Sequence, residues 1–89
     1  MKYVITWTVT NYSGAMKKFL DTGAQPPAGV KLLARYHGLA GSTRGYIVAE
    51  TADAKGIYTW LADWMEICSF DVVPVVEDAD AAQIQGARK

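Results

Sequence analysis

Residues 57–68, IYTWLADWMEIC, decide the fold, because their apolar side chains recur at helical spacing. Six of them stand at positions i, i+3, i+4, i+7, i+8 and i+11: Ile57, Trp60, Leu61, Trp64, Met65 and Cys68. This period predicts an amphipathic helix with one apolar face. Thr51 or Asp53 can cap its N-terminus. Gly56 costs up to about 1 kcal/mol relative to Ala inside a helix, so packing of the two tryptophans must compensate for it.

Strands are predicted on both sides of this helix. Residues 45–51 and 70–76 are short runs rich in β-branched and aromatic side chains. Pro74 has no N–H to donate, so the run that contains it belongs at a sheet edge. Residues 30–37 form a further strand, joined to 45–51 by a hairpin that contains three glycines.

The register of that hairpin depends on its turn. A two-residue turn at Gly41-Ser42 would place His37 opposite Tyr46 and Arg35 opposite Val48, with Glu50 diagonal to Arg35. Changing the loop by one residue would reverse which side chains share a face, so the register remains conditional.

The N-terminal region repeats the strand-helix pattern. Residues 2–9 alternate as a strand does, and Thr10 to Ser13 offer helix caps. An apolar stripe at helical spacing follows: Tyr12, Ala15, Met16, Phe19 and Leu20. Gly23 is the expected residue after the helix, which Pro26-Pro27 cannot continue. Residues 77–89 form a tail with acids first and Arg88 and Lys89 last, which predicts a short helix with charges matched to its dipole.

The resulting order, β-α-β-β-α-β, predicts an α+β fold of the ferredoxin-like type. Four antiparallel strands form one sheet with two helices on one face, and residues 1–89 form one domain. We assign the more apolar strand faces to the helices: Tyr3, Ile5, Trp7, Val30, Leu32, Ala34, Tyr36, Ile47, Ala49, Phe70, Val72 and Val76. The open face then carries Val4, Thr6, Thr8, Leu33, Arg35, His37, Tyr46, Val48, Glu50, Asp71, Val73 and Val75. Such a mixed face suits a dimer partner or a ligand pocket.

Several segments carry a resemblance to the dimeric α/β-barrel superfamily, and to a family of small bacterial domains of unknown function within it. They are Lys2-Tyr3-Val4-Ile5-Thr6-Trp7, Arg35-Tyr36-His37-Gly38, Glu50-Thr51, Trp60-Leu61-Ala62-Asp63-Trp64 and Phe70-Asp71-Val72-Val73-Pro74-Val75. The resemblance implies a homodimer in which two sheets face each other, with one pocket in each subunit. Relatives in the superfamily include cofactor-free monooxygenases, haem-degrading enzymes and isomerases. The small family has no established catalytic residues to carry over.

Composition and charge exclude several classes of protein. Nine Lys and Arg balance nine Asp and Glu, so the chain lacks the basic surplus that nucleic-acid binding needs. Arg44-Gly45-Tyr46 begins like an RNA-recognition motif, but Val48 and Glu50 stand where stacking aromatics are required. One His and one Cys do not make a metal site, and no glycine-rich strand-to-helix turn suggests a nucleotide cofactor. Without a signal-peptide core or an apolar run of membrane-spanning length, a cytoplasmic protein without membrane contact is expected.

Four residues are the candidate polar contacts of the pocket. His37 is the only histidine, so it is the candidate catalytic base, against a plain hairpin-end histidine. Arg35 and Glu50 could bind a ligand together or form a cross-strand ion pair, and Tyr46 is the hydrogen-bonding neighbour. Asp71 is a weaker candidate, and Cys68 is expected to be a buried structural thiol.

Two functions remain open. One is a homodimer that binds a small, partly apolar ligand and catalyses cofactor-free oxidation or isomerisation. The other is a non-enzymatic ligand-sensing or dimerisation module, which the lack of a complete catalytic set supports.

Overall fold

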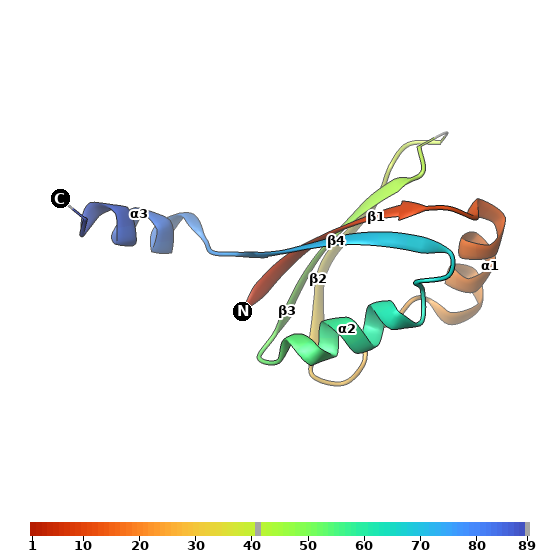
Figure 1. Cartoon of the computed structure of the whole chain (residues 1–89), viewed down its shortest axis with the longest axis horizontal. Helices are drawn as coiled ribbons and strands as arrows, with labels where there is room; N and C mark the ends of the chain where they lie inside the picture. Colours follow the sequence, from red (N-terminus) through yellow and green to blue (C-terminus); the bar gives the residue numbers. More distant parts are fainter. Residues whose placement is uncertain (41, 89) are drawn as a thin grey trace.

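The computed structural model describes residues 1–40 and 42–88 and has the predicted ferredoxin-like architecture. Its elements are β1 (Lys2–Val9), α1 (Tyr12–Thr22), β2 (Val30–His37), β3 (Arg44–Thr51), α2 (Ala54–Ala62), β4 (Cys68–Val75) and α3 (Asp78–Gly86). The strands form one antiparallel sheet in the order β2-β3-β1-β4, so β4 with Pro74 is an edge strand (Figure 1). Gly41, half of the predicted hairpin turn, lies outside the described residues.

Helix α2 packs against the sheet and forms the core with it. Of the two predicted caps, the Asp53 side chain accepts a hydrogen bond from the Lys55 N–H at 2.9 Å. The buried cluster combines residues of α2 with residues of three strands: Ile5, Val30, Ile47, Ala49, Ile57, Trp60 and Leu61. A Cβ at Gly56 would lie 2.7 Å from Val30 Cγ2. Glycine therefore costs helix propensity here but allows the helix to approach β2 closely.

The predicted helix through Cys68 is too long. Helix α2 ends at Ala62, and tight turns follow, in which the Trp64 carbonyl accepts from the Cys68 N–H at 2.9 Å. The Lys18 ammonium donates to the Asp63 carbonyl and lies 4.9 Å from the Trp64 ring centre. A side chain of α1 therefore contacts the residues at which α2 ends. Cys68 is instead the first residue of β4 and is buried there.

Helix α1 has the predicted ends but is packed less closely. The Asn11 side chain accepts from the Gly14 N–H at 3.0 Å, and Gly23 adopts a left-handed φ of 71° after the last turn. Ala15 is its one buried residue. Figure 1 shows α1 at the end of the sheet, whereas α2 lies along it.

The predicted hairpin register is wrong by one residue next to the loop, and a β-bulge interrupts β2 farther from it. Leu32 pairs with Ala49 but Ala34 pairs with Val48, so Leu33 is the extra residue. A bulge reverses the alternation of side chains beyond it. Between the bulge and the hairpin loop, His37 lies opposite Gly45 instead of Tyr46, and Arg35 opposite Ile47 instead of Val48.

The bulge also exchanges the two faces of β2 beyond Leu33. Arg35 and His37 face the helices, whereas Ala34 and Tyr36 lie on the open face, the reverse of the prediction. The face assignments for β1, β3 and β4 agree with the observed register.

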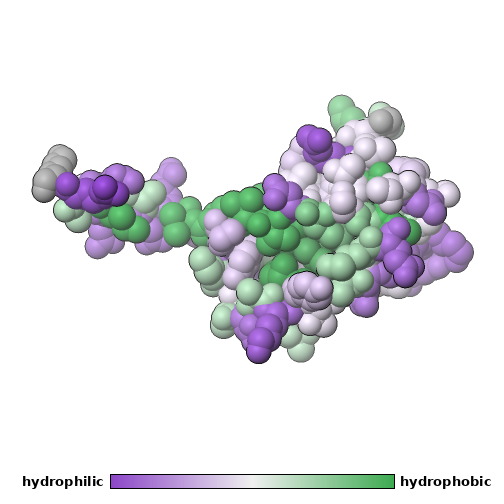
Figure 2. Space-filling model, in the orientation of Figure 1, coloured by the Kyte–Doolittle hydropathy of each residue, from purple (hydrophilic) through white to green (hydrophobic). Residues whose placement is uncertain are grey.

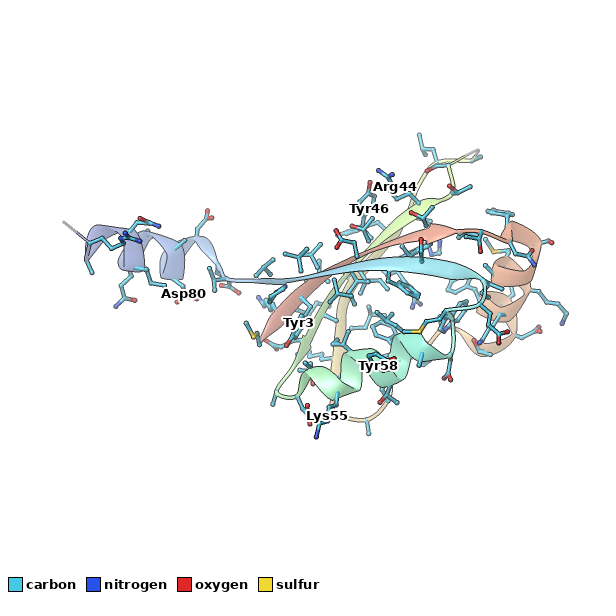
Figure 3. The ribbon with its side chains drawn as sticks, in the orientation of Figure 1. Tyr3, Arg44, Tyr46, Lys55, Tyr58 and Asp80 are labelled. Atoms are coloured by element: carbon cyan, nitrogen blue, oxygen red, sulfur yellow. The ribbon has the colours of Figure 1, made fainter. Side chains whose placement is uncertain are left out.

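The open face has an apolar centre flanked by polar rows. Its central row is Ala34, Val48, Val4 and Val73 across the four strands. One neighbouring row holds Tyr36, Tyr46, Thr6 and Asp71, and the other holds Lys31, Glu50, Lys2 and Val75. Figure 3 shows Arg44 and Tyr46 on the opposite side of the sheet from Tyr58 of α2.

Helix α3 projects from the end of β4, away from α1 (Figure 1). It has the acidic first turn expected of the tail, and none of its residues is buried. Figure 2 shows hydrophobic side chains along β4 toward its junction with α3, where Val73 and Val76 are exposed.

Candidate functional site

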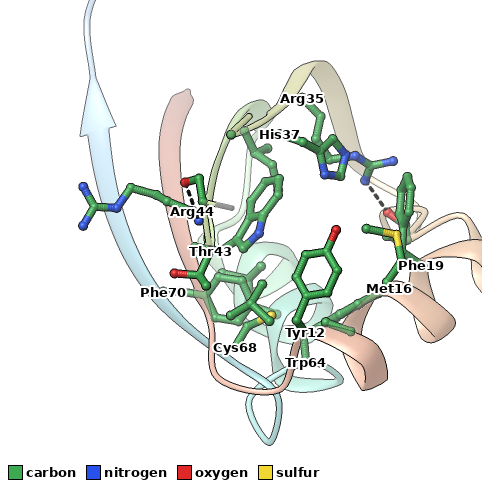
Figure 4. A pocket seen from close by; sticks show the side chains of 18 of the residues that line it. Tyr12, Met16, Phe19, Arg35, His37, Thr43, Arg44, Trp64, Cys68 and Phe70 are labelled. Carbon is green, nitrogen blue, oxygen red and sulfur yellow. Dashed lines mark hydrogen bonds between the residues drawn. The ribbon is translucent and has the colours of Figure 1, made fainter. Parts of the chain in front are cut away.

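A cavity of about 280 Å³ lies between α1, the helix-facing side of the sheet and the end of the β2-β3 hairpin (Figure 4). It exists because α1 stands away from the sheet while α2 packs onto it. The wall is mostly aromatic and aliphatic, and its main side chains are Trp7, Tyr12, Met16, Phe19, Trp64 and Phe70. A concave apolar site with few polar groups is typical of small-molecule binding.

Arg35 joins β2 to the C-terminal end of α1 at the edge of this cavity. Its guanidinium donates to the Ala24 carbonyl at 2.8 Å and to the Gly23 carbonyl at 3.0 Å. The guanidinium carbon also lies 5.2 Å from the Phe19 ring centre. Burial lowers the pKa of Arg35 from its ordinary value. Ala24 has a left-handed φ of 47°, so Arg35 holds a backbone conformation that alanine rarely adopts.

His37 borders the same cavity and lies between two aromatic rings. Its ring centre is 5.3 Å from that of Trp7 in an edge-on arrangement and 5.0 Å from that of Phe19. Within residues 1–40 and 42–88, no side chain forms a hydrogen bond with the imidazole. His37 is an exposed residue that lines the cavity, so it can meet a ligand at the rim.

Tyr46 and Glu50 lie on the other face of the sheet from Arg35 and His37. Tyr46 borders a shallow polar depression with Arg44, Thr6, Thr8, Ser69 and Asp71. Glu50 stands between Lys2 of β1 and Lys31 of β2. The pKa of Lys2 is raised chiefly by Glu77 and to a smaller extent by the charge of Glu50. The four predicted contacts thus form two pairs on opposite faces, and Asp71 shares the face of Tyr46.

Glycine 45 shapes the wall beside His37. A Cβ at this position would collide with the six-membered ring of Trp7. The missing side chain lets the indole lie across β3 and form one side of the cavity. Gly45 is buried, so a larger residue would have to displace the indole.

Cys68 completes the inner wall as a buried thiol, as predicted, but it lies at the start of β4 instead of on the helix. Burial raises the pKa of its thiol, and the nearby Lys18 ammonium partly opposes this shift. A buried thiol in apolar surroundings stays protonated and is a weak nucleophile.

The residues that line the cavity from α1 carried no functional signal in the sequence. Tyr12, Met16 and Phe19 formed a helical stripe, which indicates packing against a core. Trp64 belongs to a helical stripe and Trp7 to a central strand, and both positions predict core residues, yet both side chains are only half-buried and line the cavity. Trp60 is buried, as a core residue should be.

The described residues contain neither a metal-binding cluster nor a membrane-spanning helix. No group of three or more His, Cys, Asp or Glu side chains is arranged to hold a metal ion in this part of the chain. Among the described helices, none is long and apolar enough to cross a membrane.

Comparison with known proteins gives one match. Residues 1–89 match a family described as Domain of unknown function (DUF3303). No curated protein and no solved structure matches the chain.

Proposed function

The chain belongs to the DUF3303 family, whose function is unknown, and we propose that it binds a small, partly apolar molecule between α1 and the sheet. The cavity of about 280 Å³ with its aromatic wall carries this proposal. It is roughly twice the size of a 150 Å³ apolar cavity that accommodates benzene, so it has room for a bicyclic ligand.

Filling the cavity tests this function. Ala15 is buried on α1 and lines the cavity, so Ala15→Phe places a ring inside it. Indole should raise the melting temperature of the natural protein and give saturable heat in calorimetry, and Ala15→Phe should abolish both. Ala62→Phe adds the same ring at an exposed position on α2 and should bind indole normally. If indole and other bicyclic probes fail to bind the natural protein, the proposed function is wrong.

We further propose that two copies pair through their open faces, as in the dimeric α/β barrels that the sequence resembles. Stacking with reversed strand order would lay the apolar row of Ala34, Val48, Val4 and Val73 on the same row of the partner. The same arrangement places Lys2 near Glu50 of the partner subunit, which is a favourable contact between opposite charges. Tyr36 and Tyr46, exposed by 63% and 43% in one copy, would be covered.

The mass in solution tests the dimer. Light scattering at micromolar concentration should give about twice the chain mass of 9.7 kDa. Val48→Glu buries a charge in the apolar row and should give a monomer. Tyr58→Glu introduces the same charge on the exposed side of α2 and should leave the mass unchanged. A natural protein of single-chain mass would refute the dimer.

A catalytic role for His37 in cofactor-free oxidation or isomerisation is the second candidate function. It is favoured by an exposed imidazole at the rim of an apolar cavity, where a base can reach a bound molecule. Turnover of a bound phenol or quinone should fall at least a hundredfold in His37→Gln. Binding without turnover would support the non-enzymatic ligand-sensing module instead.

A further inference from the structure

Among the described residues, basic side chains line the cavity and carboxylates do not. The described residues that line it include Arg35, His37 and Arg44 but no Asp or Glu. Lys18 adds a fourth basic group, since its ammonium lies near the Trp64 ring and opposes the rise in the pKa of the Cys68 thiol. The chain as a whole has equal numbers of acidic and basic residues, so this imbalance is local.

Arg35 is the most suitable of these groups to bind an anion. Arginine has five N–H donors, and the Gly23 and Ala24 carbonyls accept from two of its nitrogens. The ion pairs found in the described part of the chain join Lys2 to Glu77 and Lys17 to Asp21, so neither neutralises Arg35. A half-buried guanidinium without a carboxylate partner can gain free energy from an anion that approaches its free donors.

The positions of the groups set the orientation of such a ligand. Arg35 and His37 lie at the β2 edge of the cavity, and the imidazole is exposed. The aromatic side chains and Cys68 form the interior (Figure 4). An anionic group at the rim keeps part of its hydration while an apolar body fills the interior, which limits the cost of desolvating the charge. Figure 4 shows the Arg44 side chain directed away from the cavity, so it is not a direct contact.

We propose that the cavity selects an aromatic or branched apolar carboxylic acid, whose carboxylate lies beside Arg35 and His37 and whose body lies against Trp7, Phe19 and Trp64. This inference rests on the proposed function, because it names the ligand class of the same cavity. A neutral molecule of the same shape would fill the interior but leave Arg35 without an anion.

Two ligands of nearly identical shape test the selection. 2-Naphthoate and 2-naphthamide share the bicyclic body and differ in charge, and calorimetry on the natural protein at pH 7.5 gives both affinities. We expect naphthoate to bind at least tenfold more tightly, with a ratio that falls as salt rises from 0.05 to 0.5 M. Equal affinities would overturn the selection of acids and leave the proposed function intact. If neither ligand binds, the proposed function itself fails.

Variants identify the residue that provides the selection. Arg35→Gln should lower the naphthoate-to-naphthamide ratio toward one, and Arg35→Lys should restore part of it. Because Arg35 also holds the end of α1, the folding of each Arg35 variant is first checked by circular dichroism. The ratio in the natural protein and the ratio in His37→Gln test the proposal even if the Arg35 variants do not fold. His37→Gln should reduce the ratio less than Arg35→Gln. Arg88→Gln makes the same change in net charge on α3 and should keep the full ratio, whereas an equal loss there would show a long-range charge effect and refute a contact with Arg35.

Discussion

Helices α1 and α2 lie on the same side of the sheet, yet only α2 is packed closely against it. Both begin with an Asx cap, and both have an apolar stripe. Helix α2 buries Ile57, Trp60 and Leu61, whereas α1 buries Ala15 alone. The difference starts at Gly56, which lets α2 approach Val30 within van der Waals contact.

Polar contacts hold α1 in place, whereas α2 is held by the packing of its buried side chains. Arg35 holds the carbonyls that follow α1, and Lys18 of α1 donates to the Asp63 carbonyl after α2. These contacts hold the C-terminal half of α1 and leave its apolar side facing a cavity. The packed helix therefore supplies stability, and the polar-anchored helix supplies space for a ligand.

Truncating one apolar side chain in each helix should show the difference in their packing most clearly. Ile57→Ala should lower the free energy of unfolding by about 2–5 kcal/mol, because Ile57 is in the core. Met16→Ala should cost roughly 1 kcal/mol, because Met16 is half-buried and already borders empty space. Urea denaturation followed by circular dichroism measures both. Equal losses would mean that α1 is packed as firmly as α2.

The wall of the cavity offers the next test. Gly45→Ala should destabilise the protein by about 1–3 kcal/mol, because its Cβ would collide with the Trp7 indole. The ring would be displaced into the cavity, so indole should also bind more weakly. Gly86→Ala on α3 meets no atom within 4 Å and serves as the control. Unchanged stability and indole binding in Gly45→Ala would show that Trp7 does not depend on this glycine.

Local patterns in the sequence were sufficient to predict most of the fold. The residue range of β1 and β2, the Asn11 and Gly23 ends of α1 and the edge position of Pro74 follow from spacing and backbone chemistry. Alternation in β1, β3 and β4 also assigned their faces correctly. Each of these features depends on residues close together in the chain.

The site was harder to predict, because it depends on one bulge and on one helix position. Nothing in the pattern around Leu33 marks it as an extra residue, yet it moves Arg35 and His37 to the helix-facing side. The apolar stripe of α1 would look the same whether the helix packed or stood apart. Cavity residues such as Phe19 and Trp64 were therefore indistinguishable from core residues.

Removing the N-cap of each helix should show that the two helices unfold locally in different ways. Losing a cap costs about 0.5–2 kcal/mol in either helix, so Asn11→Ala and Asp53→Ala start from similar local losses. Because α1 buries a single residue, Ala15, Asn11→Ala should speed amide hydrogen exchange in α1 alone. Asp53→Ala should speed exchange throughout the core by lowering global stability. Native-state hydrogen exchange measures both, and global acceleration in Asn11→Ala would contradict separate opening of α1.

The smallest effect is expected at α3, the helix with neither packing nor a carbonyl anchor. It is held to β1 by the ion pair between Lys2 and Glu77, both at the protein surface. The pair lowers the pKa of Glu77. Its contribution to holding α3 is therefore complete at pH values above the ordinary carboxyl pKa of about 4.3, and it is lost as the pH falls through the lowered pKa. It raises the pKa of Lys2, so at the alkaline end the contribution is lost as the pH rises through that raised value. Glu77→Gln should slightly reduce the helical Cα chemical shifts of α3 at pH 7, and the difference from the natural protein should vanish near pH 2. The same difference at both pH values would mean that α3 is held in place by something other than this charge pair.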